Sequence, residues 1–263
     1  MVVRLLMSLR RLLPLAVRLL LLPLQWAALQ AMLLLLGTGS LLWNLLALPL
    51  HHLLPRATGR RVGRAAISLG YGAFWTCARL VGMMRLHSEV LDALREQPGL
   101  IIVANHPTML DAVMLVARLP RSACIMKASL MRNPLLGPGA RLARYIRNDS
   151  AGGLVRLAVQ DLREGGQLVL FPEGTRTTVA TVGPFRPGVT LIAKLAQAPI
   201  QAVFIDTESP YLRKGWPLWR LPPLPIVFRV RLGRRFEPRD DHAALLAELQ
   251  DHFAAGVRRP PAA

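Results

Sequence analysis

Residues 100–111, LIIVANHPTMLD, decide the fold. Their first five positions are apolar and mostly β-branched, and polar residues follow at once, so they predict a buried strand. This strand delivers His106 to its carboxyl end, where open α/β sheets usually place functional groups. Pro107 suits the first turn of a helix, and Thr108 can cap a helix over 109–119. We therefore predict a strand, a turn that holds His106, and a helix.

The spacing of His106 and Asp111 predicts a pair of interacting side chains. On one straight helix, five positions would set the two side chains about 140° apart. A turn before the helix can instead bring the carboxylate back to the imidazole. Such a carboxylate fixes one imidazole tautomer and stabilises the imidazolium that forms during proton transfer. We expect His106 and Asp111 to be catalytic, although the spacing alone also fits a structural pair.

A second polar stretch, FPEGTR at 171–176, follows the apolar run QLVL at 167–170. The pattern Asn-His-x4-Asp at 105–111 and this hexapeptide, in this order, resemble the signatures of the membrane-bound glycerolipid acyltransferases. These include the 1-acylglycerol-3-phosphate acyltransferases. Weaker blocks around 127–148 and 198–203 are also similar, so that the resemblance covers roughly residues 85 to 235.

The resemblance implies which residues hold the polar head of the acceptor. It assigns Glu173 and Arg176 to the head group, with Lys127 and Arg147 as second contacts. The planar guanidinium of Arg176 suits bidentate contact with a phosphate.

The expected chemistry is acyl transfer from a thioester to a hydroxyl. A thioester is already activated, so a histidine that removes the hydroxyl proton is sufficient and no acyl-enzyme is needed. The backbone N–H groups of Gly174 and Thr175 are candidates for the oxyanion, because glycine permits a close approach. A Gly-x-Ser-x-Gly elbow is absent. We expect no metal and no cofactor, with acyl-carrier protein or acyl-coenzyme A as the donor.

Two classes of function compete. The first is a lysophospholipid O-acyltransferase that converts 1-acylglycerol 3-phosphate to phosphatidate or, alternatively, acylates a lyso-aminolipid or another lysophospholipid. The second is a non-catalytic basic protein that binds membranes or nucleic acid, since the net charge is +18. Ten arginines and no acid occur in residues 1–88, and they flank an apolar run. This distribution favours an anionic phospholipid membrane and no nucleic acid.

The uncharged run at 19–50 predicts a membrane anchor. Its 32 residues exceed one perpendicular span and fall short of two. A hairpin that turns at residues 37–40, one tilted span, and an interfacial helix before a short span all fit. We favour the hairpin, because arginines flank both ends of the run. The two cysteines predict no disulfide framework and a catalytic part that faces the cytosol at the inner (cytoplasmic) membrane.

The whole chain predicts an α/β fold with a mixed, largely parallel sheet flanked by helices and an N-terminal apolar helical segment. A loop rich in Trp and basic residues at 210–220 is expected to enter the membrane surface. The predicted domains are a membrane anchor at 1–60, an amphipathic linker helix region at 61–98, the acyltransferase domain at 99–256 and a disordered tail at 257–263. The predicted strands are 100–105, 123–127, 144–147, 167–171, 200–206 and 226–232, and the predicted helices include 109–119, 139–143, 151–164, 188–197 and 241–255.

Overall fold

The computed structural model describes residues 15–134, 137–177 and 182–257, with side chains from residue 21 onward. The arginines before residue 15 and the predicted tail from residue 258 on lie outside the described residues. The elements in chain order are α2 (Leu15–Leu53), α3 (Arg56–Leu80), β1 (Met84–His87), the 3₁₀ helix η1 (Glu89–Leu94), β2 (Leu100–Ala104), α4 (Asp111–Arg118), β3 (Ser122–Lys127), α5 (Ala128–Arg132), α6 (Pro138–Leu142), β4 (Ile146–Asn148), α7 (Ala151–Arg163), β5 (Gln167–Leu170), α8 (Gly188–Ala196), β6 (Ile200–Asp206), β7 (Ile226–Phe236) and α9 (His242–Gly256).

Within the described residues, the strands form one seven-stranded sheet in the order β1-β7-β6-β2-β5-β3-β4. Strands β6, β2, β5, β3 and β4 are parallel to one another. Strand β7 is antiparallel to β6, and β1 is parallel to β7. The predicted mixed, largely parallel α/β sheet is therefore confirmed. Strand β1 at the edge was not predicted.

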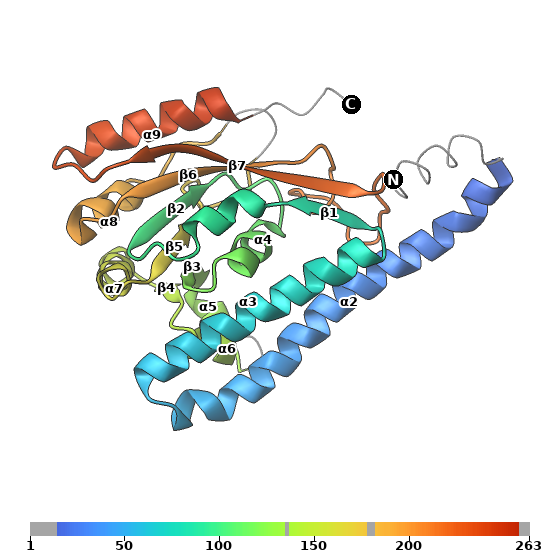
Figure 1. The fold of residues 1–263 in the computed structure, drawn as a ribbon, viewed down its shortest axis with the longest axis horizontal. Coiled ribbons are helices and arrows are strands. Elements are labelled where there is room, and N and C mark those ends of the chain that lie inside the picture. The colour runs from blue at the N-terminus through green and yellow to red at the C-terminus, as the bar shows by residue number, and fades with distance from the viewer. Residues whose placement is uncertain (1–14, 135–136, 178–181, 258–263) are drawn as a thin grey trace.

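Strand β2 lies inside the sheet and is buried on both faces, as its continuous apolar run predicts. Leu100 and Ile102 belong to a core cluster with side chains of α2, α3 and α4. Ile101 and Val103 belong to a second cluster with side chains of α7, α8 and α9. Figure 1 shows α3 and α4 on one face of the sheet and α9 on the other. Helices on both faces leave the carboxyl ends of the strands open for a site.

The N-terminal apolar run forms one continuous helix, so the predicted hairpin turn at residues 37–40 is wrong. The hydroxyl of Thr38 donates to the Leu34 carbonyl at 2.7 Å, one helical turn earlier. A threonine hydroxyl that bonds to the carbonyl four residues earlier is accommodated within a continuous helix. The chain reverses instead at residues 54–55, where Pro55 precedes α3, and α3 runs back along α2 (Figure 1).

The face of α2 that points away from the domain is apolar. Leu24, Leu34 and Leu53 are 66%, 67% and 76% exposed. Helix α2 is the one helix in the described residues that is long and apolar enough to cross a membrane, judged by length and composition alone. At 39 residues it measures about 58 Å. Its inner face is fixed to the domain, since Asn44 Oδ1 accepts a hydrogen bond from Gly139 N–H at 2.8 Å.

A buried ion pair fixes α3 to the α/β domain. Arg64 on α3 is 4% exposed, and its guanidinium lies 2.6 Å from Asp161 Oδ1 on α7. The same guanidinium donates to the carbonyls of Ala143 and Arg121 at 2.9 and 2.7 Å. Each of the three guanidinium nitrogens therefore donates to an acceptor, as a buried charge requires. Helix α3 forms one unit with the sheet.

Candidate active site

Asn105 holds the end of β2 against β6. Its side chain is buried, its Oδ1 accepts from the Ile205 N–H at 2.7 Å, and its Nδ2 donates to the Ile205 carbonyl at 2.9 Å. The two bonds replace the strand ladder where β2 ends. The chain therefore leaves the sheet at a fixed point, and His106 begins the turn that follows.

His106 and Asp111 face each other, as their spacing predicted. The distance from His106 Nδ1 to Asp111 Oδ2 is 2.8 Å, and the Asp111 side chain is fully buried while that of His106 is 20% exposed. Burial raises the pKa of Asp111, and hydrogen bonds from His106 and Thr108 oppose that rise. A carboxylate in this place holds the proton on Nδ1 and leaves the lone pair on Nε2. Within the described residues, Nε2 has no hydrogen-bond partner.

The turn between His106 and α4 is organised by the same carboxylate. Thr108 donates to Asp111 through its N–H at 2.8 Å and through its hydroxyl at 2.6 Å. Helix α4 begins at Asp111, two residues after the predicted start, because residues before it are held in the turn. A carboxylate at the first position of a helix also interacts favourably with the helix dipole.

The loop after β5 is bound to this turn. The His106 N–H donates to Thr177 Oγ1 at 3.0 Å, and the Thr177 N–H donates to the His106 carbonyl at 2.7 Å. The imidazole also stacks on the Phe171 ring, with 4.2 Å between the ring centroids. The two sequence signatures, 66 positions apart at their first residues 105 and 171, thus form one site.

Glu173 lies within this loop and is 8% exposed. Its Oε1 accepts from the Thr177 hydroxyl at 2.5 Å, and its Oε2 accepts from the Gly183 N–H at 3.0 Å. Both oxygens are therefore engaged by the protein. The structure assigns Glu173 to holding the loop around Thr177, and its expected contact with the acceptor stays a prediction.

Gly174 has a left-handed backbone with φ +68°, and a Cβ there would lie 2.5 Å from Arg186 Nε. Arg186 therefore covers the loop at this point, a contact that sequence reasoning missed. The Gly174 N–H already donates to the Phe171 carbonyl at 3.1 Å. Of the two predicted oxyanion donors, the Thr175 N–H has no hydrogen bond within the described residues.

Arg176 is joined to the first signature through Leu212. The carbonyl of Leu212 accepts from Arg176 Nη1 at 3.0 Å and from the Met109 N–H at 3.2 Å. Leu212 is buried and has φ +59°, a backbone region that is strained for a branched side chain. This strained residue was not predicted, because the contacts that define it come from distant parts of the chain.

The loop that carries Leu212 also contacts the N-terminal helix. Trp26 Nε1 donates to the Trp219 carbonyl at 2.7 Å, and Gln30 Nε2 donates to the Leu218 carbonyl at 3.0 Å. The Trp219 side chain is 72% exposed. Helix α2 is thus linked to the site through a single loop.

Lys127 and Arg147 lie farther along the sheet. Lys127 ends β3 and is exposed, and β5 separates β3 from β2. Arg147 lies on β4, at the edge of the sheet, where its Nε is 2.9 Å from Asp149 Oδ2. It lines a cavity with Arg141 and Arg144. In the part of the chain that the structure describes, no three His, Cys, Asp or Glu side chains are grouped as a metal site requires.

Comparison with known proteins agrees with this geometry. The sequence model of the Acyltransferase family matches residues 85–206, which span β1 to β6 and contain both signatures. Residues 85–206 therefore form an Acyltransferase domain. A 1-acyl-sn-glycerol-3-phosphate acyltransferase of Pseudomonas aeruginosa is 26% identical over 231 residues, which are 85% of this acyltransferase and 86% of the relative.

Other relatives match a shorter part. The 1-acyl-sn-glycerol-3-phosphate acyltransferase of Limnanthes alba is 28% identical over 150 residues. The aligned part covers 54% of this chain and 52% of that relative. The human lysophospholipid acyltransferase LPCAT4 is 29% identical over 54% of this chain and 28% of its own. The crystal structure of the 1-acyl-sn-glycerophosphate (LPA) acyltransferase PlsC from Thermotoga maritima has the same fold. It aligns with a TM-score of 0.61 and 17% identity over 89% of this acyltransferase and 93% of PlsC.

Proposed function

We propose that this acyltransferase moves a fatty acyl group from a thioester to the free hydroxyl of a lysophospholipid. The preferred acceptor is 1-acylglycerol 3-phosphate, which gives phosphatidate. The observation that carries the proposal is the 2.8 Å contact between His106 Nδ1 and Asp111 Oδ2, with Nε2 available to an incoming hydroxyl.

His106 acts as the general base in this proposal. Nε2 takes the proton of the acceptor hydroxyl while its oxygen attacks the thioester carbonyl carbon. Asp111 holds the ring and stabilises the imidazolium that results. When the C–S bond breaks, the imidazolium returns the proton to the thiolate. Proton transfer of this kind accelerates a reaction typically by roughly 10²–10⁴-fold.

Direct transfer without an acyl-enzyme is supported by what surrounds His106. The nucleophile would have to lie within hydrogen-bond distance of the base. Among the described residues, the imidazole contacts the side chains of Asp111 and Phe171, and neither is a serine or a cysteine. Cys124 is in β3, and burial raises the pKa of its thiol to about 12, so it is not an activated nucleophile.

The acceptor's phosphate is assigned to Arg176. One of its N–H groups bonds to the Leu212 carbonyl, which fixes the guanidinium and leaves further donors for two phosphate oxygens. The names of the bacterial and plant relatives support 1-acylglycerol 3-phosphate. The similarity to LPCAT4 favours a second candidate, in which the acceptor is another lysophospholipid.

Membrane association is supported by the exposed leucines of α2 and by Trp219 in the loop next to the site. A lipid acceptor can then reach His106 from the membrane surface. We place the protein at the inner (cytoplasmic) membrane with its catalytic domain in the cytosol, where acyl-carrier protein or acyl-coenzyme A supplies the thioester.

The test is a panel of donors and acceptors assayed on the purified full-length protein by lipid mass spectrometry. The panel pairs acyl-carrier protein and acyl-coenzyme A thioesters with 1-acylglycerol 3-phosphate, other lysophospholipids and a lyso-aminolipid. We expect phosphatidate as the main product, formed roughly 10²–10⁴-fold more slowly with His106→Ala. A covalent acyl-protein adduct formed from thioester without acceptor would overturn the direct transfer.

A further inference from the structure

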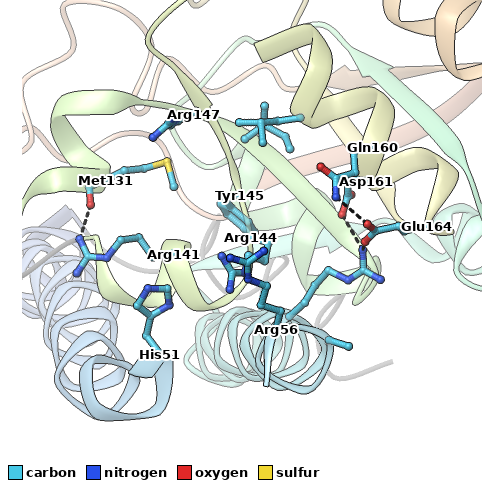
Figure 2. Close-up of a pocket in the computed structure, with 14 residues that line it drawn as sticks. His51, Arg56, Met131, Arg141, Arg144, Tyr145, Arg147, Gln160, Asp161 and Glu164 are labelled. Carbon is cyan, nitrogen blue, oxygen red and sulfur yellow. Dashed lines mark hydrogen bonds and ion pairs between the residues drawn. The ribbon is translucent and has the colours of Figure 1, made fainter. Parts of the chain in front are cut away.

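A cavity of about 680 Å³ lies at the edge strand β4 (Figure 2). In the sheet, β5 and β3 separate β4 from β2, the strand that precedes His106. Its walls come from the ends of α2 and α3, from α5 and α6, from β4 and from α7. Four of the arginines that line it define what we call the arginine pocket, namely Arg56, Arg141, Arg144 and Arg147.

The carboxylates that line this cavity are already neutralised. Asp161 and Glu164 lie on one wall, and Arg60 pairs with them at 3.3 and 2.5 Å. Asp161 also pairs with the buried Arg64. These two acids therefore leave no free negative charge for the arginine pocket.

Two guanidinium groups of the pocket lack a counter-charge. Among the described residues, no carboxylate lies within ion-pair distance of Arg56 or Arg144. Arg141 donates to the Met131 carbonyl, a neutral group, at 2.5 Å. In Figure 2, Arg144 lies between Arg141 and Arg56. Burial and the charge of Arg56 lower the pKa of Arg144, as expected of like charges that face one space.

The backbone at Arg144 is strained as well. Arg144 has φ +58°, and it follows α6 at the position where the N–H of Tyr145 donates to the Ala140 carbonyl at 3.0 Å. Glycine is usual at this position of a helix end, because other residues pay a steric cost there. An arginine at this position therefore destabilises the fold through its left-handed backbone and through repulsion from the like charge of Arg56. A ligand that needs the guanidinium accounts for its presence.

The surroundings of the pocket indicate what kind of anion it takes. His51, which also lines the cavity, is in the last turn of α2. On the same part of α2, Leu45, Leu46 and Leu53 are 51%, 56% and 76% exposed. A ligand with a phosphate in the pocket and apolar chains on these leucines would satisfy both surfaces.

We propose that the arginine pocket binds the phosphate of an anionic glycerophospholipid, as a site separate from the one at His106. The same chemistry could come from a soluble phosphate, and the test distinguishes the two sources. Planar guanidinium groups bind phosphate oxygens in pairs. Arg147 is paired with Asp149, and Arg56, Arg141 and Arg144 supply these groups in the pocket.

The test compares the full-length protein with the double variant Arg56→Gln/Arg144→Asn. Asparagine tolerates the left-handed backbone at 144 and removes the charge. The probes are phosphatidylcholine vesicles with and without phosphatidylglycerol, and inorganic phosphate added to the protein in neutral detergent. Binding to vesicles is measured by flotation, and phosphate binding by the shift in melting temperature.

We expect wild type to prefer vesicles with phosphatidylglycerol, and the double variant to lose roughly 30-fold of that preference. Each basic residue at an anionic surface contributes about fivefold. The control Arg95→Gln/Arg156→Gln, which removes two exposed arginines elsewhere, should keep the preference. Acyl transfer in detergent should be unchanged, which separates this site from the proposed function.

The single variant Arg144→Asn reports on folding. Its melting temperature without ligand should rise above that of wild type, because strain and like-charge repulsion are both reduced. A phosphate-induced shift that only wild type shows, with no preference between vesicles, would assign the site to a soluble phosphate. Equal vesicle preference and equal phosphate shifts in wild type and double variant would overturn the proposal.

Discussion

The carboxyl edge of the sheet and the arginine pocket hold their charged groups in opposite ways. At the carboxyl edge, Asp111 and Glu173 are buried, and each of their oxygens accepts a hydrogen bond from the protein. In the pocket, Arg56 and Arg144 lie close enough to repel each other, and neither has a carboxylate partner among the residues that the structure describes. A satisfied network fixes the geometry of reacting groups, whereas unsatisfied charges of one sign leave room for a ligand.

Replacing His106 by Ala should have the largest effect at the carboxyl edge. We expect the rate of acyl transfer to fall by roughly 10²–10⁴-fold, since the general base is removed. Initial rates with an acyl thioester and 1-acylglycerol 3-phosphate measure this effect. His87→Ala, at an exposed histidine on β1, is the matched control and should keep the wild-type rate. Equal rates for the two variants would remove His106 from the mechanism.

Asp111→Asn keeps the shape of the side chain and removes the charge that holds the imidazole. We expect kcat to fall, by no more than in His106→Ala, with little change in KM, because the wrong imidazole tautomer is then favoured. Asp92→Asn changes a partly exposed carboxylate that pairs with Arg118 at 3.1 Å and should leave kcat unchanged. A rise in KM without a fall in kcat would contradict the orienting role.

Arg176→Gln should act on binding and not on the chemical step. The KM for 1-acylglycerol 3-phosphate should rise roughly 10- to 100-fold, the range for a lost hydrogen bond to a charged group. Steady-state kinetics with varied lysolipid measure this change. The control is Arg163→Gln, because Arg163 also donates to a leucine carbonyl, that of Leu195 at 2.7 Å, but on the surface. An unaltered KM would exclude Arg176 from the head-group site.

Thr177→Val tests whether the two signatures depend on each other. It preserves the volume but removes the hydroxyl that accepts from the His106 N–H and donates to Glu173. We expect kcat to fall about tenfold, since one buried hydrogen bond is lost on each side. In Thr76→Val the lost hydroxyl bonds only to Gly72 within α3, and kcat should not change. Wild-type kcat in Thr177→Val would show that the bonds at Thr177 do not affect the reaction.

The smallest effect concerns stability and pH. Burial raises the pKa of Asp111 in the folded state, so the folded protein binds this proton more tightly than the unfolded chain. The resulting contribution to the free energy of unfolding is complete below about pH 4. It is lost as the pH rises through the pKa of the folded state. Asp111→Asn has no such loss. The melting temperature of the variant minus that of wild type should therefore increase between pH 4 and pH 7, by roughly 2–4 °C for each kcal/mol. A difference that stays constant or falls with pH would contradict the raised pKa.

Local patterns predicted the parts of the fold that depend on local sequence. The apolar run at 100–104 identified β2. The contact between His106 and Asp111 could be predicted because both residues belong to the short turn between β2 and α4. Strand β1 was missed, since its alternation of apolar and polar residues extends over only four positions, including Arg85 and His87, and gives a weak signal. Its position depends on pairing with β7, which is about 140 residues away.

Long-range contacts explain the remaining misses. Residues 37–40 contain the glycines and hydroxyl residues of a turn, but the helix continues through them and α3 packs alongside. The left-handed residues Arg144 and Leu212 carry no signal in the sequence, since glycine or asparagine would have marked such a backbone. The role of Leu212 depends on the hydrogen bonds that its carbonyl accepts from Met109 and Arg176, which are distant in the sequence.

The hydrogen bonds from Trp26 and Gln30 to the carbonyls of residues 218 and 219 bear on the design of chimeric enzymes. Helix α2 and the loop at 207–220 are about 190 residues apart in the chain, yet hydrogen bonds join them into one structural unit that includes Leu212. A chimera that takes this loop from a homologue but keeps its own first helix would join surfaces that were never selected together. Exchanges intended to alter lipid preference should therefore move both segments as one cassette.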